Sequence, residues 1–239
     1  RDIYPESMYR KLLDSGIIHS GMSILDVGTG TGVIPRHLVA SGAQFYASDL
    51  SAAQIAEAIK LSVGMPIVYA VAPAEHSPFE GVKFDLVSAC QCFWYFNISD
   101  FLIELKRILK PKGCLCRISM EWLPFESQLA AETERIVLQF NPKWTGGGYR
   151  VKNYVVPDWA KNCFDLEILF AYRENLPFTI DSWCGRMRSC RGIGATLSRD
   201  EVLQFDAALR RSLEMIIGDG MFEIPHYICV ELFRRKPPF

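Results

Sequence analysis

Three glycines at alternating positions, followed by an aspartate at the end of the next apolar run, are the residues of this chain most suited to chemistry. In the run Ser23-Ile-Leu-Asp-Val-Gly-Thr-Gly-Thr-Gly32, an apolar stretch typical of a buried strand leads directly into the glycines. Glycines let the backbone turn sharply and approach a ligand, and a helix expected at 33–40 points its free N–H groups at that ligand. A second strand, expected at 43–48, ends at Asp49, whose carboxylate can accept both hydroxyls of a ribose. The pattern predicts the nucleoside-binding half of a doubly wound sheet.

The spacing of the glycines indicates which nucleoside binds. A dinucleotide fingerprint has glycine at its first, third and sixth positions, whereas the sixth position counted from Gly28 is Val33. Asp26 lies two residues ahead of Gly28, and its charge repels a pyrophosphate but attracts a sulfonium or an ammonium group. Leu25-Asp-Val-Gly-Thr-Gly-Thr-Gly32 therefore resembles the first motif of the class I S-adenosylmethionine-dependent methyltransferases. A glycine turn in another α/β protein is the alternative.

The resemblance covers most of the chain and implies a donor site for S-adenosylmethionine, with S-adenosylhomocysteine as product and no metal. Asp49-Leu-Ser-Ala-Ala-Gln54 resembles the family's second motif, with Asp49 on the ribose and Leu50 against the adenine. Ala74-Glu75 resembles the loop that meets the adenine amino group, and a solvated Glu75 is the alternative. The donor-site residues that the resemblance implies are Arg1, Asp26, Gly28, Thr29, Gly30, Asp49, Leu50, Ala74, Glu75 and Gln91.

The segment after the expected fourth strand narrows the resemblance to one branch. Gln91-Cys-Phe-Trp-Tyr-Phe-Asn97 resembles the Gln-Ala-Phe-His-Trp-Phe-Asp signature of the small-molecule branch that includes trans-aconitate-methyltransferase-like enzymes. Arg1-Asp-Ile-Tyr-Pro5 resembles an element near the start of that branch, which implies that Arg1 closes over the methionine end of the donor. Trp94 replaces the usual histidine and Asn97 the usual aspartate, so no catalytic base is carried over. Trp94 and Tyr95 are expected either to line an apolar slot that can hold a cation or to belong to the core.

Alternating strands and helices up to residue 120 predict a parallel sheet with right-handed crossovers. Strands are expected at 67–71, 84–89, 114–120, 164–170 and 222–233, and helices at 5–15, 52–62, 100–109, 127–140, 182–190 and 198–217. Ser198 and Glu201 match a capping box, and 109–113 is expected to be a turn. The resemblance implies an α/β fold with a doubly wound, Rossmann-like seven-stranded sheet, whose last strand is antiparallel beside the fifth.

Segments that have no place in a minimal fold of this class predict a cap inserted after the fifth strand. The expected domains are a cofactor-binding α/β core at 1–120, a cap and substrate insertion with the sixth strand at 121–197, and a final helix and strand at 198–239 that complete the core. Such additions usually lie over strand ends, where ligands bind.

Candidate acceptor residues lie next to the expected fifth strand and in the cap. Glu121 and Trp122 directly follow that strand, and Glu121 is the candidate base, with a salt bridge as the alternative. Arg186 is expected to bind a carboxylate or a phosphate. The alternative is that it lies on a solvated helix face, and this alternative is favoured for Arg188. We expect one cavity facing the methyl group, for a small, partly aromatic or apolar acceptor with an anionic group, lined by Trp94, Tyr95, Glu121, Trp122 and Arg186.

Composition limits the function further. The 239 residues carry 26 basic and 27 acidic side chains, a net charge of −1, which gives no basic surface for nucleic acid. No apolar run is long enough for a membrane span, and the eight cysteines are expected to be reduced thiols of a cytoplasmic monomer or homodimer.

The expected activity is methyl transfer to a small-molecule acceptor by in-line displacement, achieved mainly through positioning. A nucleic-acid or protein methyltransferase of the same fold and a non-catalytic cofactor-binding regulator are the alternatives.

Overall fold

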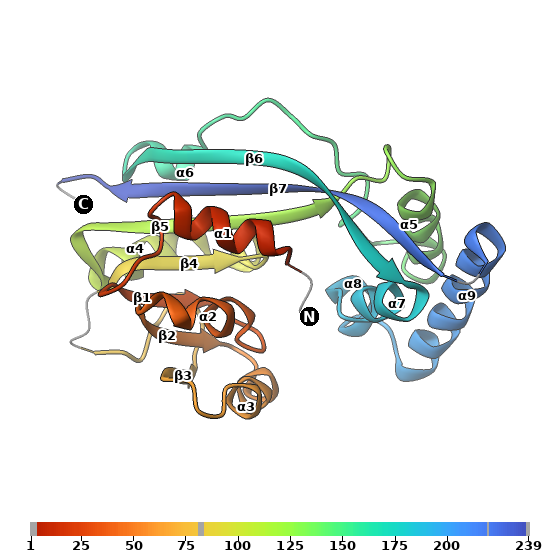
Figure 1. Cartoon of the computed structure of the whole chain (residues 1–239), viewed down its shortest axis with the longest axis horizontal. Helices are drawn as coiled ribbons and strands as arrows, with labels where there is room; N and C mark the ends of the chain where they lie inside the picture. Colours follow the sequence, from red (N-terminus) through yellow and green to blue (C-terminus); the bar gives the residue numbers. More distant parts are fainter. Residues whose placement is uncertain (1–3, 81–83, 219, 238–239) are drawn as a thin grey trace. The chain divides into compact units, whose positions relative to one another are not determined.

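The computed structural model describes residues 4–80, 84–218 and 220–237 (Figure 1). The chain forms two compact units. The core unit comprises the described residues of Asp2–Ser119, Tyr154–Ala171 and Cys229–Phe239. The helical unit comprises the described residues of Met120–Asn153 and Tyr172–Ile228.

The sheet has the strand order β3-β2-β1-β4-β5-β7-β6. Its strands are β1 (Ser23–Val27), β2 (Gln44–Asp49), β3 (Ile67–Val71), β4 (Phe84–Cys90), β5 (Leu109–Trp122), β6 (Phe164–Thr179) and β7 (Met221–Arg235). β1 pairs in parallel with both β2 and β4, and β7 runs opposite to β5 and β6 in Figure 1. The expected doubly wound seven-stranded sheet with an antiparallel last strand is therefore confirmed. Its switch point lies at β1, so the loops after β1 and β4 meet at the carboxyl edge of the sheet.

Helices cover both faces of the sheet in the core unit. They are α1 (Glu6–Asp14), α2 (Val33–Leu38), α3 (Ala52–Leu61), α4 (Ile98–Ile108) and α6 (Asp158–Lys161). In Figure 1, α1 lies in front of the sheet and α4 behind it. Phe101, Leu105 and Ile108 recur at the spacing of one helix face, and this face of α4 packs on buried strand residues such as Val87 and Leu115.

The helical unit contains α5 (Gln128–Phe140), α7 (Ile180–Arg188), α8 (Arg191–Gly194) and α9 (Arg199–Ile217). The expected capping box of Ser198 and Glu201 is present at the start of α9, and Ser127 caps α5. Thr179 and Ser182 form a second capping box at α7, which therefore begins at Ile180 and not at the expected residue 182. No helix of the part of the chain described here is long and apolar enough to cross a membrane.

Two strands are longer than the sequence predicted. The expected turn at 109–113 belongs to β5, which pairs through Leu109 with Phe84 and changes register before Cys114. A proline is tolerated in a strand at such an irregularity. β6 does not end at residue 170 but continues to Thr179, because exposure still alternates and Leu176 and Phe178 stay buried. Pro177 is compatible with an edge strand, where one N–H group needs no partner.

A buried ion pair joins β5 to β7 in the core unit. Arg117 donates to both oxygens of Glu231, at 2.5 and 2.6 Å, and the Tyr154 hydroxyl donates to the same carboxylate at 2.8 Å. Glu231 is only 1% exposed. The guanidinium also lies over Phe93 and Trp159, with 5.3 and 5.9 Å to the ring centroids. Arg117 therefore packs against Phe93, the buried ring of the segment that follows β4.

We predict that Arg117→Met destabilises the protein by about 3 kcal/mol or more, because Glu231 keeps its charge but loses its cation. Tyr154→Phe removes one hydrogen bond and costs about 1 kcal/mol. Chemical denaturation followed by circular dichroism measures both changes. Lys161→Met, which breaks the exposed pair with Asp158, is the control and leaves the transition unchanged. An Arg117→Met transition equal to that of the control would contradict a stabilising role for the buried pair.

Candidate functional site

The loop after β1 has two tightly packed glycines and one open glycine. Gly28, Gly30 and Gly32 all have a positive φ, of 63°, 59° and 73°. A Cβ on Gly28 would meet Cys92 Cβ and Sγ at 2.8 Å, and one on Gly32 would overlap the Tyr69 hydroxyl. A Cβ on Gly30 would find its nearest neighbour, Gln54 Oε1, at 3.8 Å. The loop is therefore anchored on both sides and leaves space over Gly30, where a ligand can approach the backbone.

Two carboxylates hold this loop in place. Asp26 is 1% exposed, and its two oxygens accept hydrogen bonds from the hydroxyls of Thr29 and Ser88, both at 2.6 Å. Burial raises the pKa of the Asp26 carboxyl to about 6, against the effect of these two hydrogen bonds. Thr29 is also buried, and its N–H donates to Ser48 O at 3.0 Å. The predicted residues Asp26 and Thr29 thus fix the loop, and direct contact of Asp26 with a donor stays a prediction.

Asp49 lies at the carboxyl end of β2, as the sequence predicted. Its Oδ2 accepts from the Gly30 N–H at 2.9 Å, and its Oδ1 accepts from the Ser51 N–H at 2.8 Å. Each carboxylate oxygen can accept a further hydrogen bond, so the group remains able to bind two hydroxyls. Leu50 beside it is 75% exposed, which leaves an apolar surface for a flat ring.

The loop before α4 brings Glu75 and Asn97 together. Glu75 Oε1 accepts from the Asn97 N–H at 2.7 Å, so Glu75 has a structural contact in addition to its exposed surface. Asn97 is the N-cap of α4, a position for which asparagine and aspartate are equally suited. Asparagine in place of the aspartate of the branch signature therefore keeps the helix cap. Ala74 is buried in the core unit.

The exit of β4 contains a strained residue and two half-exposed rings. Gln91 has a φ of 56°, the only positive value among the non-glycine residues described. Such conformations cost free energy and are often found at functional sites. Trp94 and Tyr95 are 52% and 49% exposed and contact each other edge to face, whereas Phe93 is buried. Trp94 and Tyr95 are therefore not core residues of this unit.

Arg186 is a buried cation in the helical unit. It is 8% exposed, lies over the Trp122 ring at 5.3 Å and donates from Nη1 to Cys190 Sγ at 3.2 Å. Among the residues described, its Nε has no hydrogen-bond partner. The sequence alternative of a solvated helix face is wrong for Arg186.

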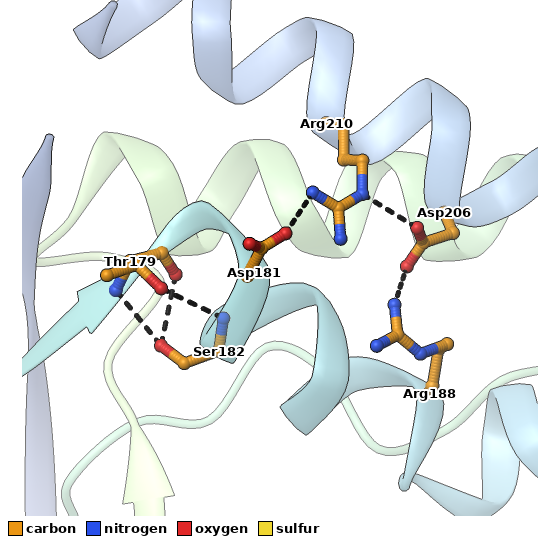
Figure 2. Close-up of polar contacts among 6 residues, drawn as sticks. All are labelled: Thr179, Asp181, Ser182, Arg188, Asp206 and Arg210. Atoms are coloured by element: carbon orange, nitrogen blue, oxygen red, sulfur yellow. Dashed lines mark hydrogen bonds and ion pairs between the residues drawn. The ribbon is translucent and has the colours of Figure 1, made fainter. Parts of the chain in front are cut away.

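Other arginines of this unit are neutralised by carboxylates, as Figure 2 shows. Arg188, for which the sequence favoured a solvated helix face, pairs with Asp206. Arg210 on α9 bridges Asp206, at 2.8 Å, and Asp181 on α7. The pairs of Arg188 with Asp206 and of Arg210 with Asp181 join α7 to α9. A buried guanidinium without such a carboxylate is the kind of group that an anionic ligand completes.

Glu121, Trp122 and Arg186 lie in the same unit, as predicted, and influence one another. Burial raises the pKa of the Glu121 carboxyl to about 7, and the positive charge of Arg186 limits the rise. The Trp122 indole donates to Glu134 Oε1 at 2.7 Å, and Glu134 Oε2 accepts from the Gly148 N–H at 2.8 Å. The ring that faces Arg186 is therefore held in one orientation.

The predicted acceptor residues belong to different units. Trp94 and Tyr95 lie in the core unit, whereas Glu121, Trp122 and Arg186 lie in the helical unit. A single cavity formed by all five residues stays a prediction, as do the bounds of the three expected domains. Arg1, expected at the methionine end of the donor, lies outside the described residues.

Sequence reasoning missed two buried polar residues of the helical unit. Glu134 follows Ala130 by four residues and precedes Val137 by three, on the buried face of α5. His226 is fully buried on the same side of β7 as Phe222, Ile224 and Ile228. Helical spacing and strand alternation place both in the core, so both could have been found from the sequence.

The other candidate sites of the described residues offer few groups that could bind or react with a ligand. Within the described ranges, no group of three or more His, Cys, Asp or Glu side chains could hold a metal ion. A cavity of about 610 Å³ lies in the core unit where β1 and β4 begin, at the end opposite the glycine loop. Its charged side chains are largely paired, Lys110 with Asp85 and Arg234 with Glu167.

An open α/β sheet with a glycine loop and a strand-end aspartate at its switch point defines a nucleoside-binding α/β protein. Residues 25–117 match the family described as "Methyltransferase domain". An uncharacterized methyltransferase of Schizosaccharomyces pombe is 29% identical over 136 residues, which are 54% of this chain and 53% of that protein. The chain thus spans about half the length of this relative. Residues 25–117 thus form a methyltransferase domain, and the relatives that match the chain more widely are named methyltransferases.

Two further comparisons extend over most of the chain. A malonyl-acyl-carrier-protein O-methyltransferase of Magnetococcus marinus is 24% identical over 230 residues, or 89% of this chain and 78% of that protein. The solved structure of phosphoethanolamine N-methyltransferase 2 of Haemonchus contortus, in complex with phosphomonomethylethanolamine and S-adenosylhomocysteine, is 20% identical. It covers 98% of this chain and 53% of its own, with a TM-score of 0.54. At this identity the likeness shows the fold alone.

The glycine loop generates a paired prediction. Gly28→Ala puts a Cβ into Cys92, whereas Gly30→Ala has no such overlap, although both place alanine at a positive φ that costs about 1–2 kcal/mol. We expect Gly28→Ala to lower the melting temperature much more than Gly30→Ala, and Gly30→Ala to weaken binding of S-adenosylhomocysteine in a protein that still folds. Differential scanning calorimetry and titration calorimetry measure the two effects. Equal losses of stability, or unchanged affinity in Gly30→Ala, would contradict this account of the loop.

Proposed function

We propose that this protein transfers a methyl group from S-adenosylmethionine to a small-molecule acceptor that carries an anionic group. The observation that carries the proposal is the arrangement of Asp49 beside the open Gly30 at the switch point of the sheet. When bound, the donor supplies an electrophilic methyl group on a sulfonium. The reaction is an in-line displacement, for which holding the two reactants in line can supply much of the rate.

The donor site is built from the loops of the core unit. Asp49 accepts from the ribose hydroxyls, Gly30 allows the backbone to approach, and Leu50 packs against the adenine. Glu75 and Gln91 complete the site at the loops after β3 and β4. The fit is supported by the exposed Leu50, by the space over Gly30 and by the remaining acceptor capacity of the Asp49 carboxylate.

The acceptor is bound through the helical unit. Arg186 donates to the anionic group, and the Trp122 ring supplies an apolar wall. The Magnetococcus marinus relative is named a malonyl-acyl-carrier-protein O-methyltransferase, and a malonyl group carries a carboxylate, which supports an acceptor with an anionic group. With a pKa of about 7, Glu121 can donate or accept a hydrogen bond near neutral pH, so it can orient an acceptor or take a proton from it.

A nucleic-acid acceptor is less well supported. The net charge of −1 provides no basic surface for a nucleic acid. A non-catalytic regulator would bind the donor without consuming it, and release of S-adenosylhomocysteine with small carboxylic acids distinguishes an enzyme from such a regulator.

We expect Asp49→Ala to reduce the affinity for S-adenosylhomocysteine by about 1.5–3 kcal/mol, the usual loss for hydrogen bonds to a charged group. Titration calorimetry measures the dissociation constant, and melting curves establish that the variant is folded. Glu57→Ala, which removes an exposed partner of Lys60 on α3, is the matched control and leaves the affinity unchanged. Wild-type affinity in Asp49→Ala would overturn the donor site.

Arg186→Ala should raise the KM for the acceptor at least tenfold, since a charge-assisted hydrogen bond is lost, with little effect on donor binding. Release of S-adenosylhomocysteine, measured with a panel of aliphatic and aromatic carboxylic acids, gives the KM. Arg188→Ala is the control, because that arginine lies on the same helix but pairs with Asp206. Equal effects of the two substitutions on KM would contradict acceptor binding by Arg186.

A further inference from the structure

Two buried nitrogen atoms of the helical unit lack a hydrogen-bond partner among the residues that the structure describes. They are Nε of Arg186, 8% exposed, and Nε2 of His226, fully buried. A buried polar atom left without a partner destabilises the folded protein, so such atoms are rare unless a ligand or a water completes them. Arg186 is part of the proposed acceptor site, whereas His226 has no role in it so far.

The hydrogen bond of the other ring nitrogen fixes the state of His226. Nδ1 lies 2.8 Å from the Ile224 carbonyl oxygen, and since a carbonyl can only accept, Nδ1 carries the hydrogen. Burial lowers the pKa of His226 to about 4, and the charge of Arg186 adds to this effect. The imidazole is therefore neutral at pH 7, and its Nε2 offers a lone pair to a donor.

His226 and Arg186 are connected by a continuous aromatic cluster. His226 contacts Phe178 and Trp183, with ring centroids 5.9 and 6.3 Å apart. Trp183 contacts Trp122 edge to face at 5.9 Å, and Arg186 lies over the Trp122 ring. The cluster therefore combines apolar walls with one cation and one neutral acceptor.

The polar atoms of the neighbouring indoles are already used. Trp183 donates to Thr133 Oγ1 at 2.9 Å, and Trp122 donates to Glu134. Neither indole N–H can therefore complete Nε2. A positively charged donor is disfavoured there, because the positive charge of Arg186 already acts on His226. The group that suits Nε2 is a neutral hydroxyl.

We propose that Arg186 and His226 together recognise one small hydroxy acid with an apolar body, the guanidinium donating to its carboxylate and His226 Nε2 accepting from its hydroxyl. This inference rests on the proposed function, because that hydroxy acid is the methyl acceptor or resembles it. A carboxylate neutralises the buried cation, and a hydroxyl satisfies the buried lone pair, so one ligand removes both penalties. The competing explanation is that a separate water molecule completes each of the two buried nitrogen atoms.

Mandelate and phenylacetate are suitable probes, because they differ by a single hydroxyl. Titrations of the whole chain with both enantiomers of mandelate and with phenylacetate are followed by tryptophan fluorescence and calorimetry, without and with saturating S-adenosylhomocysteine. We expect the protein to bind the better enantiomer of mandelate about tenfold more tightly than phenylacetate. Arg186→Met should weaken both acids at least tenfold.

His226→Phe separates the two contacts. It should abolish the preference for mandelate and leave phenylacetate binding within about twofold, whereas His226→Gln, which keeps an acceptor atom, should retain part of the preference. Near-ultraviolet circular dichroism establishes that the packed ring cluster is intact, and His226→Gln provides the test if His226→Phe does not fold. Arg188→Met is the control for a general loss of positive charge, and should bind both acids as the unmodified protein does.

Several results would overturn the inference. They are no binding of either acid at millimolar concentration, equal affinities for the two acids in the unmodified protein, and a preference for mandelate that survives in His226→Phe. Equal affinities are the result expected if waters alone occupy the two atoms. If the unmodified protein binds S-adenosylhomocysteine but does not prefer mandelate to phenylacetate, the hydroxy-acid site is wrong and the proposed function stands. If it prefers mandelate but does not bind S-adenosylhomocysteine, the proposed function is wrong and the hydroxy-acid site stands.

Discussion

The buried carboxylate of Asp26 is the constraint on which the donor site depends. It accepts from Thr29 on the glycine loop and from Ser88 on β4, and so it joins the glycine loop to the neighbouring strand at the switch point. Burial at this position disfavours the charged form, as its raised pKa shows, and the two short hydroxyl contacts offset part of the cost. The chain therefore retains a costly buried acid because it fixes the loop whose Gly30 N–H orients Asp49.

Many elements of the fold follow from local sequence rules. An apolar run before Gly28, the caps at Ser51 and Ser198, and the aspartate after β2 are each fixed by neighbouring residues, so their positions could be predicted. The ends of β5 and β6 could not. Pro111 and Gly113 favour a turn on their own, but pairing with β4 draws the stretch from Leu109 into the sheet. Here tertiary pairing overrides local preference.

The roles of the expected acceptor residues were harder to predict, because the role of a polar side chain depends on the residues that pack against it. Arg186 and Arg188 lie two residues apart on α7, yet one is buried against Trp122 and the other pairs with Asp206 on α9. Their sequence context does not distinguish them. Glu134 and His226 are different, since helical spacing and strand alternation already place them inward.

The charge of Arg186 links the other titratable groups of the helical unit. It lowers the pKa of Glu121, which burial raises. It also lowers the pKa of His226, which burial lowers as well. An anion bound to the guanidinium cancels part of this field, so the pKa of Glu121 rises further and its protonated form is favoured. The pKa of His226 rises as well, but it starts from about 4 and the ring remains neutral at pH 7. Anion binding thus favours Glu121 as a hydrogen-bond donor that orients the acceptor over its use as a base, while His226 stays an acceptor, which gives the site two neutral polar groups of opposite kind beside one cation.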